Sequence, residues 1–224
     1  MNPPKVLYAT DEDIAIRAPS DFALLCPREQ VLAAGNDGAF GATDRWLLRS
    51  NAVSFPALGL APGQVVQLTG PAAGLLPATD LLVVDQVLPE GLRLRRKGGA
   101  AGVGMPPGPA AGSTGVAFLV TTFAPQIEAA TEELNRRCGI VPPPDGRPAL
   151  DPGDLRELCE ATVLAVLHAR YLDLAQDEAG ILAFKARALR AQLDGLLTAF
   201  SLHGNDPVAD DGCARASFGT RVVR

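Results

Sequence analysis

The fold of this chain is decided by residues 80–97, which read DLLVVDQVLPEGLRLRRK. The opening run, residues 80–88, is mostly apolar, and the Pro-Glu-Gly that follows it is typical of a tight turn. Residues 92–97 then follow the period of a strand, which places Leu92 and Leu94 on one face and three of the four cations, Arg93, Arg95 and Lys97, on the other. This pattern predicts a β-hairpin with one face in a core.

More short strands are expected around the hairpin, because apolar runs separated by glycine and proline fill residues 45–122. The other runs that favour strands are 46–49, 52–55, 64–69 and 115–122. Strands of this length joined by tight turns predict a small antiparallel β-barrel or sandwich.

The residues ahead of this region predict short elements. Thr10 followed by Asp11, Glu12 and Asp13 is typical of a helix start, since acids suit the first turn of a helix. The remaining patterns indicate a strand at 6–9, a helix at 20–25, a helical turn at 28–34 and a turn at 36–38.

The apolar periodicity becomes helical after Ala124-Pro125. Three segments carry it, 125–138, 151–174 and 182–200, with a left-handed end expected at Gly139 and Pro152 at a first helical position. The last two segments have apolar stripes that can bury each other. These stripes are Leu155, Leu158, Cys159, Val163, Val166, Leu167, Tyr171 and Leu174, then Leu182, Ala186, Leu189, Leu193, Leu196, Leu197 and Phe200.

An α+β protein in three parts is therefore expected. Residues 1–124 form an N-terminal region with short helices and the small β domain, residues 125–200 form a three-helix antiparallel unit, and residues 201–224 form an extended tail. The tail is mostly polar and is expected to be disordered or to order on a partner.

Composition excludes several classes of protein. The 224 residues carry a net charge of −5, which argues against a basic nucleic-acid binder. Four cysteines without CxxC spacing and two histidines argue against a zinc site or a disulfide framework. The opening residues MNPPKVLY predict no secretory signal, and no apolar run is long enough to span a membrane. We expect a soluble chain that is assembled in the cytoplasm with reduced cysteines.

The most motif-like segment is 98–115, which reads GGAAGVGMPPGPAAGSTG. Its glycines suggest a phosphate-binding loop, but no helix start or Gly-Lys-Ser/Thr follows them. The alternative is a long connection between strands. A loop of this length often has a role, and we favour ordering against a neighbouring subunit.

Arg93, Arg95, Arg96 and Lys97 form the only basic cluster. One interpretation is a contact with DNA phosphates or an acidic partner. The other, which we favour for an acidic chain, is a solvated edge strand whose charges block unwanted pairing.

Other polar residues predict no chemistry. His168 is expected to be partly buried and hydrogen-bonded, and His203 to lie near the end of the last helix. Trp46 is expected to anchor the β core rather than to hold a ligand. We therefore assign no catalytic, cofactor-binding or metal-binding residue and expect no enzymatic activity.

The helical part resembles the adaptor (head–tail connector) proteins of tailed bacteriophages and gene transfer agents. The resemblance is carried by residues 125–128 (PQIE), 134–137 (LNRR) and 155–159 (LRELC), with the stripe that runs to Tyr171. The β part, with residues 55–68, 82–87 and 92–94, is similar to a small barrel common in phage neck and tail components. A β domain ahead of the helices departs from the usual all-helical adaptor.

The resemblance implies a ring, usually of twelve copies, that docks beneath the portal protein and surrounds passing DNA without reading its sequence. It implies a place in the virion neck, between capsid and tail, after assembly in the host cytoplasm, with stopper or tail-side neck proteins as further partners. The tail would reach the portal or a neighbouring copy, through Phe218, Arg221, Val222, Val223 and Arg224. Another neck or tail component, or a small ligand-binding protein or enzyme that uses residues 98–115, remains the alternative.

Overall fold

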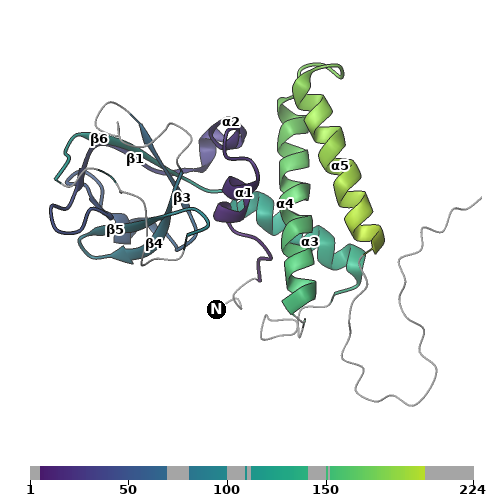
Figure 1. Ribbon diagram of the computed structural model, residues 1–224, viewed down its shortest axis with the longest axis horizontal. Coiled ribbons are helices and arrows are strands. Elements are labelled where there is room, and N and C mark those ends of the chain that lie inside the picture. The colour runs from purple at the N-terminus through teal and green to yellow at the C-terminus, as the bar shows by residue number, and fades with distance from the viewer. Residues whose placement is uncertain are drawn as a thin grey trace, which may run out of the picture. The chain divides into compact units, whose positions relative to one another are not determined.

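The computed structural model of the chain describes residues 6–69, 81–99, 109, 112–140, 150 and 152–199. The chain divides into two compact units (Figure 1). The β unit is Thr10–Ala124, and the helical unit joins Met1–Ala9 to Pro125–Arg224.

In the described part of the β unit there are six antiparallel strands: β1 (Val31–Phe40), β2 (Leu47–Arg49), β3 (Val65–Thr69), β4 (Leu82–Leu88), β5 (Gly91–Arg96) and β6 (Val116–Thr121). Their order is β1-β2-β5-β4-β3-β6, and β6 pairs with β1, so the sheet closes into a barrel. The hairpin of residues 80–97 is confirmed, because Leu88 pairs with Gly91 across the turn and β4 continues beside β5.

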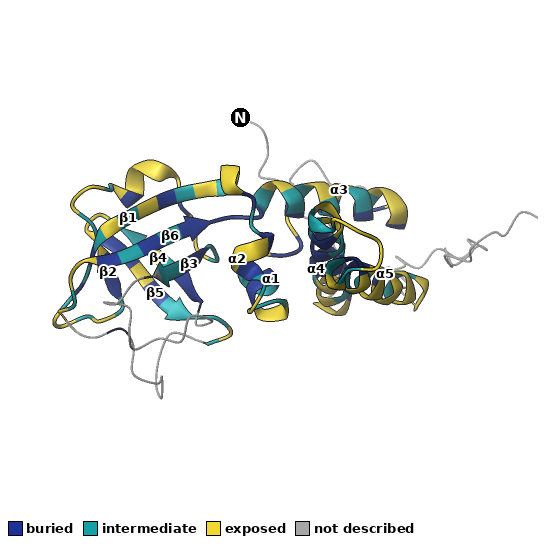
Figure 2. Cartoon of the chain, turned by 90° about the horizontal axis from the view of Figure 1, so that it is seen from above, coloured by how far each residue is buried: buried dark blue, intermediate teal, exposed yellow. Residues whose placement is uncertain are grey.

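The interior of the barrel is the main core of the β unit. Leu92 and Leu94 of β5 are both buried in it, which confirms the alternation seen in the sequence. Phe55 and Phe118 pack there with ring centroids 5.5 Å apart, and Trp46 lies partly buried against the same cluster, as expected. Figure 2 shows β6 largely buried, whereas buried and more exposed residues are interspersed along β1.

Helix α1 (Asp11–Arg17) begins as the sequence predicts. The Thr10 hydroxyl accepts the Asp13 N–H, and the Asp13 carboxylate accepts the Thr10 N–H, which completes a capping box. A second short helix, α2 (Phe22–Leu25), follows, and Phe22 packs edge-on against Phe123 with ring centroids 5.2 Å apart. Both helices belong to the β unit.

Three elements expected in the first part of the chain are absent or shorter than predicted. Residues 6–9 form no strand, and the turn at 28–34 is only a 3-10 turn, η1 (Arg28–Gln30), because β1 begins at Val31. Residues 52–55 form no strand either; a 3-10 helix, η2 (Phe55–Leu58), starts at Phe55.

The turn expected at 36–38 lies inside β1 instead. The register of β1 against β6 shifts between Gly35 and Gly38, so the turn-forming residues are absorbed as an irregularity of a paired strand. Glycine is required there: a Cβ at Gly35 would lie 2.6 Å from the Phe118 ring, and one at Gly38 would lie 2.6 Å from the Val116 carbonyl oxygen.

The helical unit contains α3 (Ala124–Cys138), α4 (Pro152–Leu174) and α5 (Ile181–Ala199), close to the three predicted segments. Gly139 ends α3 with φ of +66°, and Ile140 N–H donates to the Asn135 carbonyl at 2.9 Å, which is a Schellman motif. Leu134 of α3 packs with residues of both other helices, namely Ala161, Leu164 and Leu193.

The segment before Thr10 packs with the helices, although the sequence grouped it with the β domain. Tyr8 lies in a cluster with Cys138, Ile140 and Leu158, and its hydroxyl donates to Asn135 at 2.5 Å. Residues 6–9 therefore contribute to the core of the helical unit beside α3, α4 and α5.

The predicted stripe of α4 is mostly buried, with one error. Leu155 is 40% exposed, whereas Leu158, Val163 and Leu167 are buried as expected. Among the described residues, none of the helices combines the length and apolar character that crossing a membrane requires.

Candidate functional site

Several residues that the sequence singled out lie outside the described residues. This holds for Phe218, Arg221, Val222, Val223 and Arg224, for the whole segment 201–224, and for most of the glycine-rich segment 98–115. The basic cluster of β5, by contrast, is described in full.

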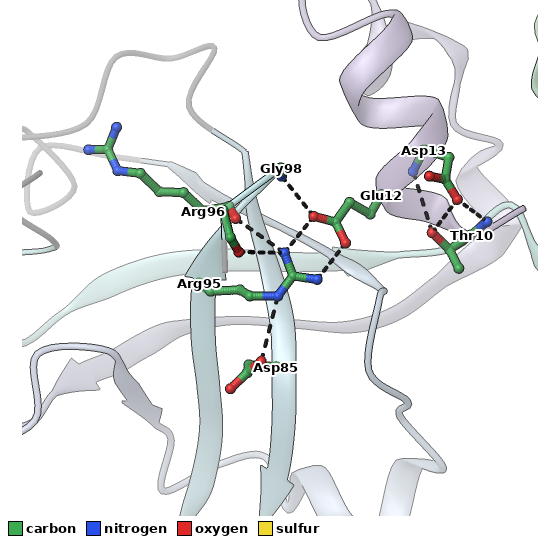
Figure 3. Close-up of polar contacts among 8 residues, drawn as sticks. Thr10, Glu12, Asp13, Asp85, Arg95, Arg96 and Gly98 are labelled. Atoms are coloured by element: carbon green, nitrogen blue, oxygen red, sulfur yellow. Dashed lines mark hydrogen bonds and ion pairs between the residues drawn. The ribbon is translucent and has the colours of Figure 1, made fainter. Parts of the chain in front are cut away.

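Arg95 of β5 is bound by a carboxylate of α1. Its guanidinium donates through two nitrogens to the two carboxylate oxygens of Glu12, each at 2.5 Å, which is a bidentate pair (Figure 3). Asp85 of the neighbouring strand β4 lies 3.6 Å from Nε of the same guanidinium. The side chains of Arg95 and Glu12 are only 19% and 14% exposed, so the pair is largely shielded from water.

The same cluster holds the start of the glycine-rich segment. Gly98 N–H donates to Glu12 at 2.8 Å, and Arg95 also donates to the carbonyls of Arg96 and Gly99, each at 3.3 Å. Burial alone would raise the pKa of Glu12, but the hydrogen bonds from Arg95 and Gly98 and the charge of Arg95 hold that pKa below its usual value. Glu12 therefore favours its ionised form and binds both Arg95 and the Gly98 N–H at the end of β5.

The other cations of β5 are placed differently. Arg93 forms a more exposed ion pair with Asp44 at 2.8 Å. Arg96 extends away from the Glu12 cluster (Figure 3), and Lys97 is half-buried at the end of the strand. Strand alternation places Arg93 and Arg95 on one face as predicted, but each already faces a carboxylate. They do not form an open row of cations for phosphates.

Asp11, the neighbour of Glu12, is a buried acid. Its Oδ1 accepts the Phe123 N–H at 2.6 Å, and the residue is only 5% exposed. Burial raises the pKa of Asp11 to about 6, against the lowering effect of its hydrogen bonds with Phe123 and the Thr122 side chain. Sequence reasoning assigned Asp11 only to the first helical turn and gave no signal of this burial.

The helical unit carries a cleft between α4 and α5, which we call the α4–α5 cleft. It has a volume of about 550 Å³, and its apolar lining includes Leu172, Ala175, Ala183 and Ala186. His168 lies in it, with Nδ1 2.9 Å from the Ala186 carbonyl, which matches the partly buried, hydrogen-bonded histidine that we expected. Because a carbonyl oxygen can only accept, Nδ1 carries the hydrogen in this contact.

Beside the cleft, α5 exposes two large apolar side chains. Ile181 is 72% and Phe184 is 64% exposed, and Figure 2 shows the outer face of α5 exposed along most of its length. We call this pair the α5 ridge. The exposure of these two side chains could have been predicted from the sequence, because neither residue belongs to the apolar stripe predicted for α5.

No cluster in the described part of the chain has the composition of a metal site, which needs several His, Cys, Asp or Glu residues together. Cys138 is buried and its thiol pKa is raised by that burial, so it is poorly suited to act as a nucleophile. In comparisons with known proteins, the chain matches no family model, no curated protein and no solved structure.

Proposed function

We propose that this chain is a structural virion protein: a subunit of a head–tail adaptor ring that bridges the portal to the neck and tail and lines the channel through which DNA passes. The observation that carries the proposal is the α5 ridge. A folded helical hairpin that leaves an isoleucine and a phenylalanine mostly in water presents a surface suited to a protein partner.

The electrostatics of the β unit support passage of DNA rather than binding. Arg95 is neutralised by Glu12, and Arg93 faces Asp44, so the basic strand offers few cations that could replace counterions on a phosphate backbone. The chain as a whole is acidic, with a net charge of −5. An acidic surface of this kind can surround DNA without binding it tightly.

The proposed partners are further copies of the chain, the portal protein, and stopper or tail-side neck proteins. Residues 201–224, and Phe218 and Arg221–Arg224 within them, are proposed to bind the portal, because mostly polar segments commonly fold on a partner surface.

The test is co-purification with the portal protein encoded in the same phage or prophage genome. The full chain and a variant that ends at residue 204 are each co-expressed with the tagged portal, and the complexes are imaged by electron microscopy. A ring on the portal that the shortened chain fails to form supports the proposal. Absence of binding by both versions rejects it.

The α4–α5 cleft favours one second candidate, a small ligand-binding protein. Its volume of about 550 Å³ lies in the range of small-molecule sites, and His168 supplies a polar group beside an apolar floor. A thermal-shift screen of metabolites and nucleotides tests this candidate, and a stabilising ligand should lose its effect in a His168→Ala variant.

A further inference from the structure

The outer face of α5 carries a regular row of uncharged residues. Six positions follow one another at spacings of three and four residues in alternation, and all six are exposed. This alternating spacing is the one by which one helix packs along a second helix. We call the row the α5 seam, and it consists of Ile181, Phe184, Ala188, Ala191, Gly195 and Thr198.

The α5 seam is separate from the surface by which α5 packs within its own hairpin. The buried residues of the helix are Ala183, Ala186 and Leu193. At about 100° per residue, the seam lies roughly half a turn around the helix from them. Figure 2 shows that outer face exposed. Ala191 also borders the α4–α5 cleft, but the seam itself runs along the solvent side of the helix.

The two ends of the α5 seam differ in size in a way that suits a copy of the same seam running in the opposite direction. Ile181 and Phe184 are large and are 72% and 64% exposed, whereas a Cβ at Gly195 would meet nothing within 4 Å. Antiparallel pairing of two seams brings the large residues of one copy opposite small residues of the other. The resulting layers are Ile181 with Thr198, Phe184 with Gly195, and Ala188 with Ala191.

Parallel pairing of the same seams fits poorly. It places Phe184 against Phe184 and Gly195 against Gly195, so one layer forces the helices apart and another leaves a gap between them. Overfilled and empty layers both cost stability, since helix contacts need close packing along their whole length. The sizes of the seam residues therefore favour the antiparallel direction.

The charges beside the seam favour the same direction. Arg187 and Asp194 flank one edge of the seam one heptad apart, and antiparallel pairing places Arg187 of each copy near Asp194 of the other. Within the chain, Arg187 donates through Nη1 to the Glu178 carbonyl, and Arg190 binds Oδ2 of Asp194. The described residues supply no other partner for the Arg187 guanidinium or for Oδ1 of Asp194, and the Asp194 side chain is 53% exposed.

We propose that the α5 seam is the contact of a two-fold symmetric dimer, in which the seam of a second copy of this chain lies antiparallel upon it. This goes beyond the proposed function, because such a contact is complete at two copies and does not propagate into a ring. It also covers the α5 ridge. The ridge can then bind another protein only after the two copies separate.

The dimer is expected to be weak. Helix α5 has 19 residues and is therefore about 28 Å long. A single pair of helices of this length covers less than the roughly 800 Å² per partner of a stable protein interface. Association should accordingly appear within a series from micromolar to millimolar concentration.

The first experiment measures sedimentation velocity of the full chain over that series. Gly195→Leu fills the space that receives Phe184 of the other copy, so it should weaken association at least tenfold. The same change should keep or raise the unfolding temperature of the monomer, because the position is open and leucine favours a helix more than glycine does. Ala169→Leu is the matched control, since it adds the same side chain to an exposed alanine of α4 outside the seam.

A compensating change then tests the register. Phe184→Ala alone leaves the layer empty and should also weaken association at least tenfold. Combined with Gly195→Leu, it returns each of these layers to one large and one small side chain. The double variant should therefore associate at least tenfold more tightly than either single variant. Circular dichroism establishes that every variant is folded.

Cross-linking tests the direction. Ile181→Cys and Thr198→Cys chains are mixed in equal amounts and treated with a short bismaleimide, and the joined peptides are identified by mass spectrometry with the wild-type chain as background. The antiparallel dimer should join position 181 to position 198. Links of 181 to 181 and 198 to 198 in its place would reject it.

Three further results would overturn the dimer: a wild-type chain that stays monomeric throughout, a Gly195→Leu chain that associates like wild type, or a folded double variant that regains no association. Portal capture is measured separately on the wild-type chain. If the dimer behaves as expected and portal capture fails, the proposed function is rejected and the dimer stands. If portal capture succeeds and the seam variants do not respond, only the dimer is rejected.

Discussion

Glu12 and Arg95, which are 83 positions apart in the sequence, form a bidentate ion pair that ties α1 to β5. The pair is largely shielded from water, and Glu12 also accepts the N–H of Gly98. Removal of either charge leaves the other partly buried without its bidentate partner, which costs more than the pair itself gains.

We predict that Glu12→Gln lowers the free energy of unfolding by about 2 kcal/mol, the range for charge-assisted hydrogen bonds that are shielded from water. The measurement is urea unfolding at pH 7, in a double-mutant cycle with Arg95→Gln. The matched control is Arg93→Gln, whose pair with Asp44 is more exposed and should contribute under about 1 kcal/mol. Equal effects at the two positions would contradict the prediction.

The stability that Asp11 contributes should change with pH in the opposite direction to the stability that Glu12 contributes. The pKa of Asp11 in the folded protein, about 6, lies above the ordinary value of 3.8, so the folded state binds more protons between these values. The contribution of Asp11 to stability is therefore fully present below about pH 4 and is lost as the pH rises through 6. Glu12, with its lowered pKa, instead contributes stability that is lost as the pH falls.

We predict that Asp11→Asn stabilises the protein at pH 7 relative to wild type, by on the order of 2 kcal/mol, because the amide keeps an acceptor for the Phe123 N–H without a buried charge. At pH 4 this advantage should disappear. The measurement is urea unfolding of both proteins from pH 4 to pH 7. Stability curves that run parallel over this range would show that Asp11 titrates as an ordinary surface acid.

Gly139 and Gly195 should respond to alanine in opposite directions. Gly139 ends α3 with a positive φ of 66°, where a Cβ is strained, so Gly139→Ala should cost about 1 kcal/mol. Gly195 lies inside α5, and a Cβ there meets nothing within 4 Å, so Gly195→Ala should stabilise by about 0.5–1 kcal/mol. Thermal unfolding monitored by circular dichroism measures both. A stabilising Gly139→Ala would mean that the turn after α3 differs from the Schellman motif.

The elements that the sequence predicts well are those fixed by local chemistry. The β4–β5 hairpin follows from a proline–glycine turn between an apolar run and an alternating one, and the start of α1 follows from Thr10 and Asp13. The wrong predictions arise where contacts between residues distant in the sequence override the local preference of a segment. Residues 36–38 have turn chemistry, yet they pair with β6 because Gly35 and Gly38 admit the close approach of Phe118 and Val116.

The candidate sites were less predictable for the same reason. Alternation along β5 indicates which face Arg95 occupies, but nothing local indicates that Glu12 lies opposite it. Asp11 and Glu12 are adjacent acids in one helical turn. Asp11 nevertheless faces the Phe123 backbone and Glu12 faces Arg95, because neighbouring residues of a helix point in different directions. The α5 ridge could have been found, because Ile181 and Phe184 fall off the predicted stripe.

Arg93 and Arg95 are already paired with carboxylates, which leads to a prediction about DNA binding. Non-specific binders that bring several free cations to the phosphate backbone typically reach dissociation constants of about 10⁻⁴–10⁻⁶ M at physiological salt. This chain has a net charge of −5, and two of the four basic residues in its cluster face carboxylates. We predict a dissociation constant weaker than about 10⁻⁴ M for a short DNA duplex, measured by fluorescence anisotropy of the labelled duplex.

The comparison that decides the role of β5 uses two variants with similar changes in charge. Arg93→Gln combined with Lys97→Gln alters the basic cluster, and Arg45→Gln combined with Arg49→Gln removes two exposed arginines outside it. If DNA only passes by, both variants bind the duplex as weakly as wild type does, and lowering the salt strengthens all three proteins to a similar extent. Micromolar binding that falls steeply with salt and is lost only in the cluster variant would instead make β5 a DNA-binding strand. The proposed ring would then hold DNA at its β unit, with Glu12 restraining one cation while the others contact phosphates.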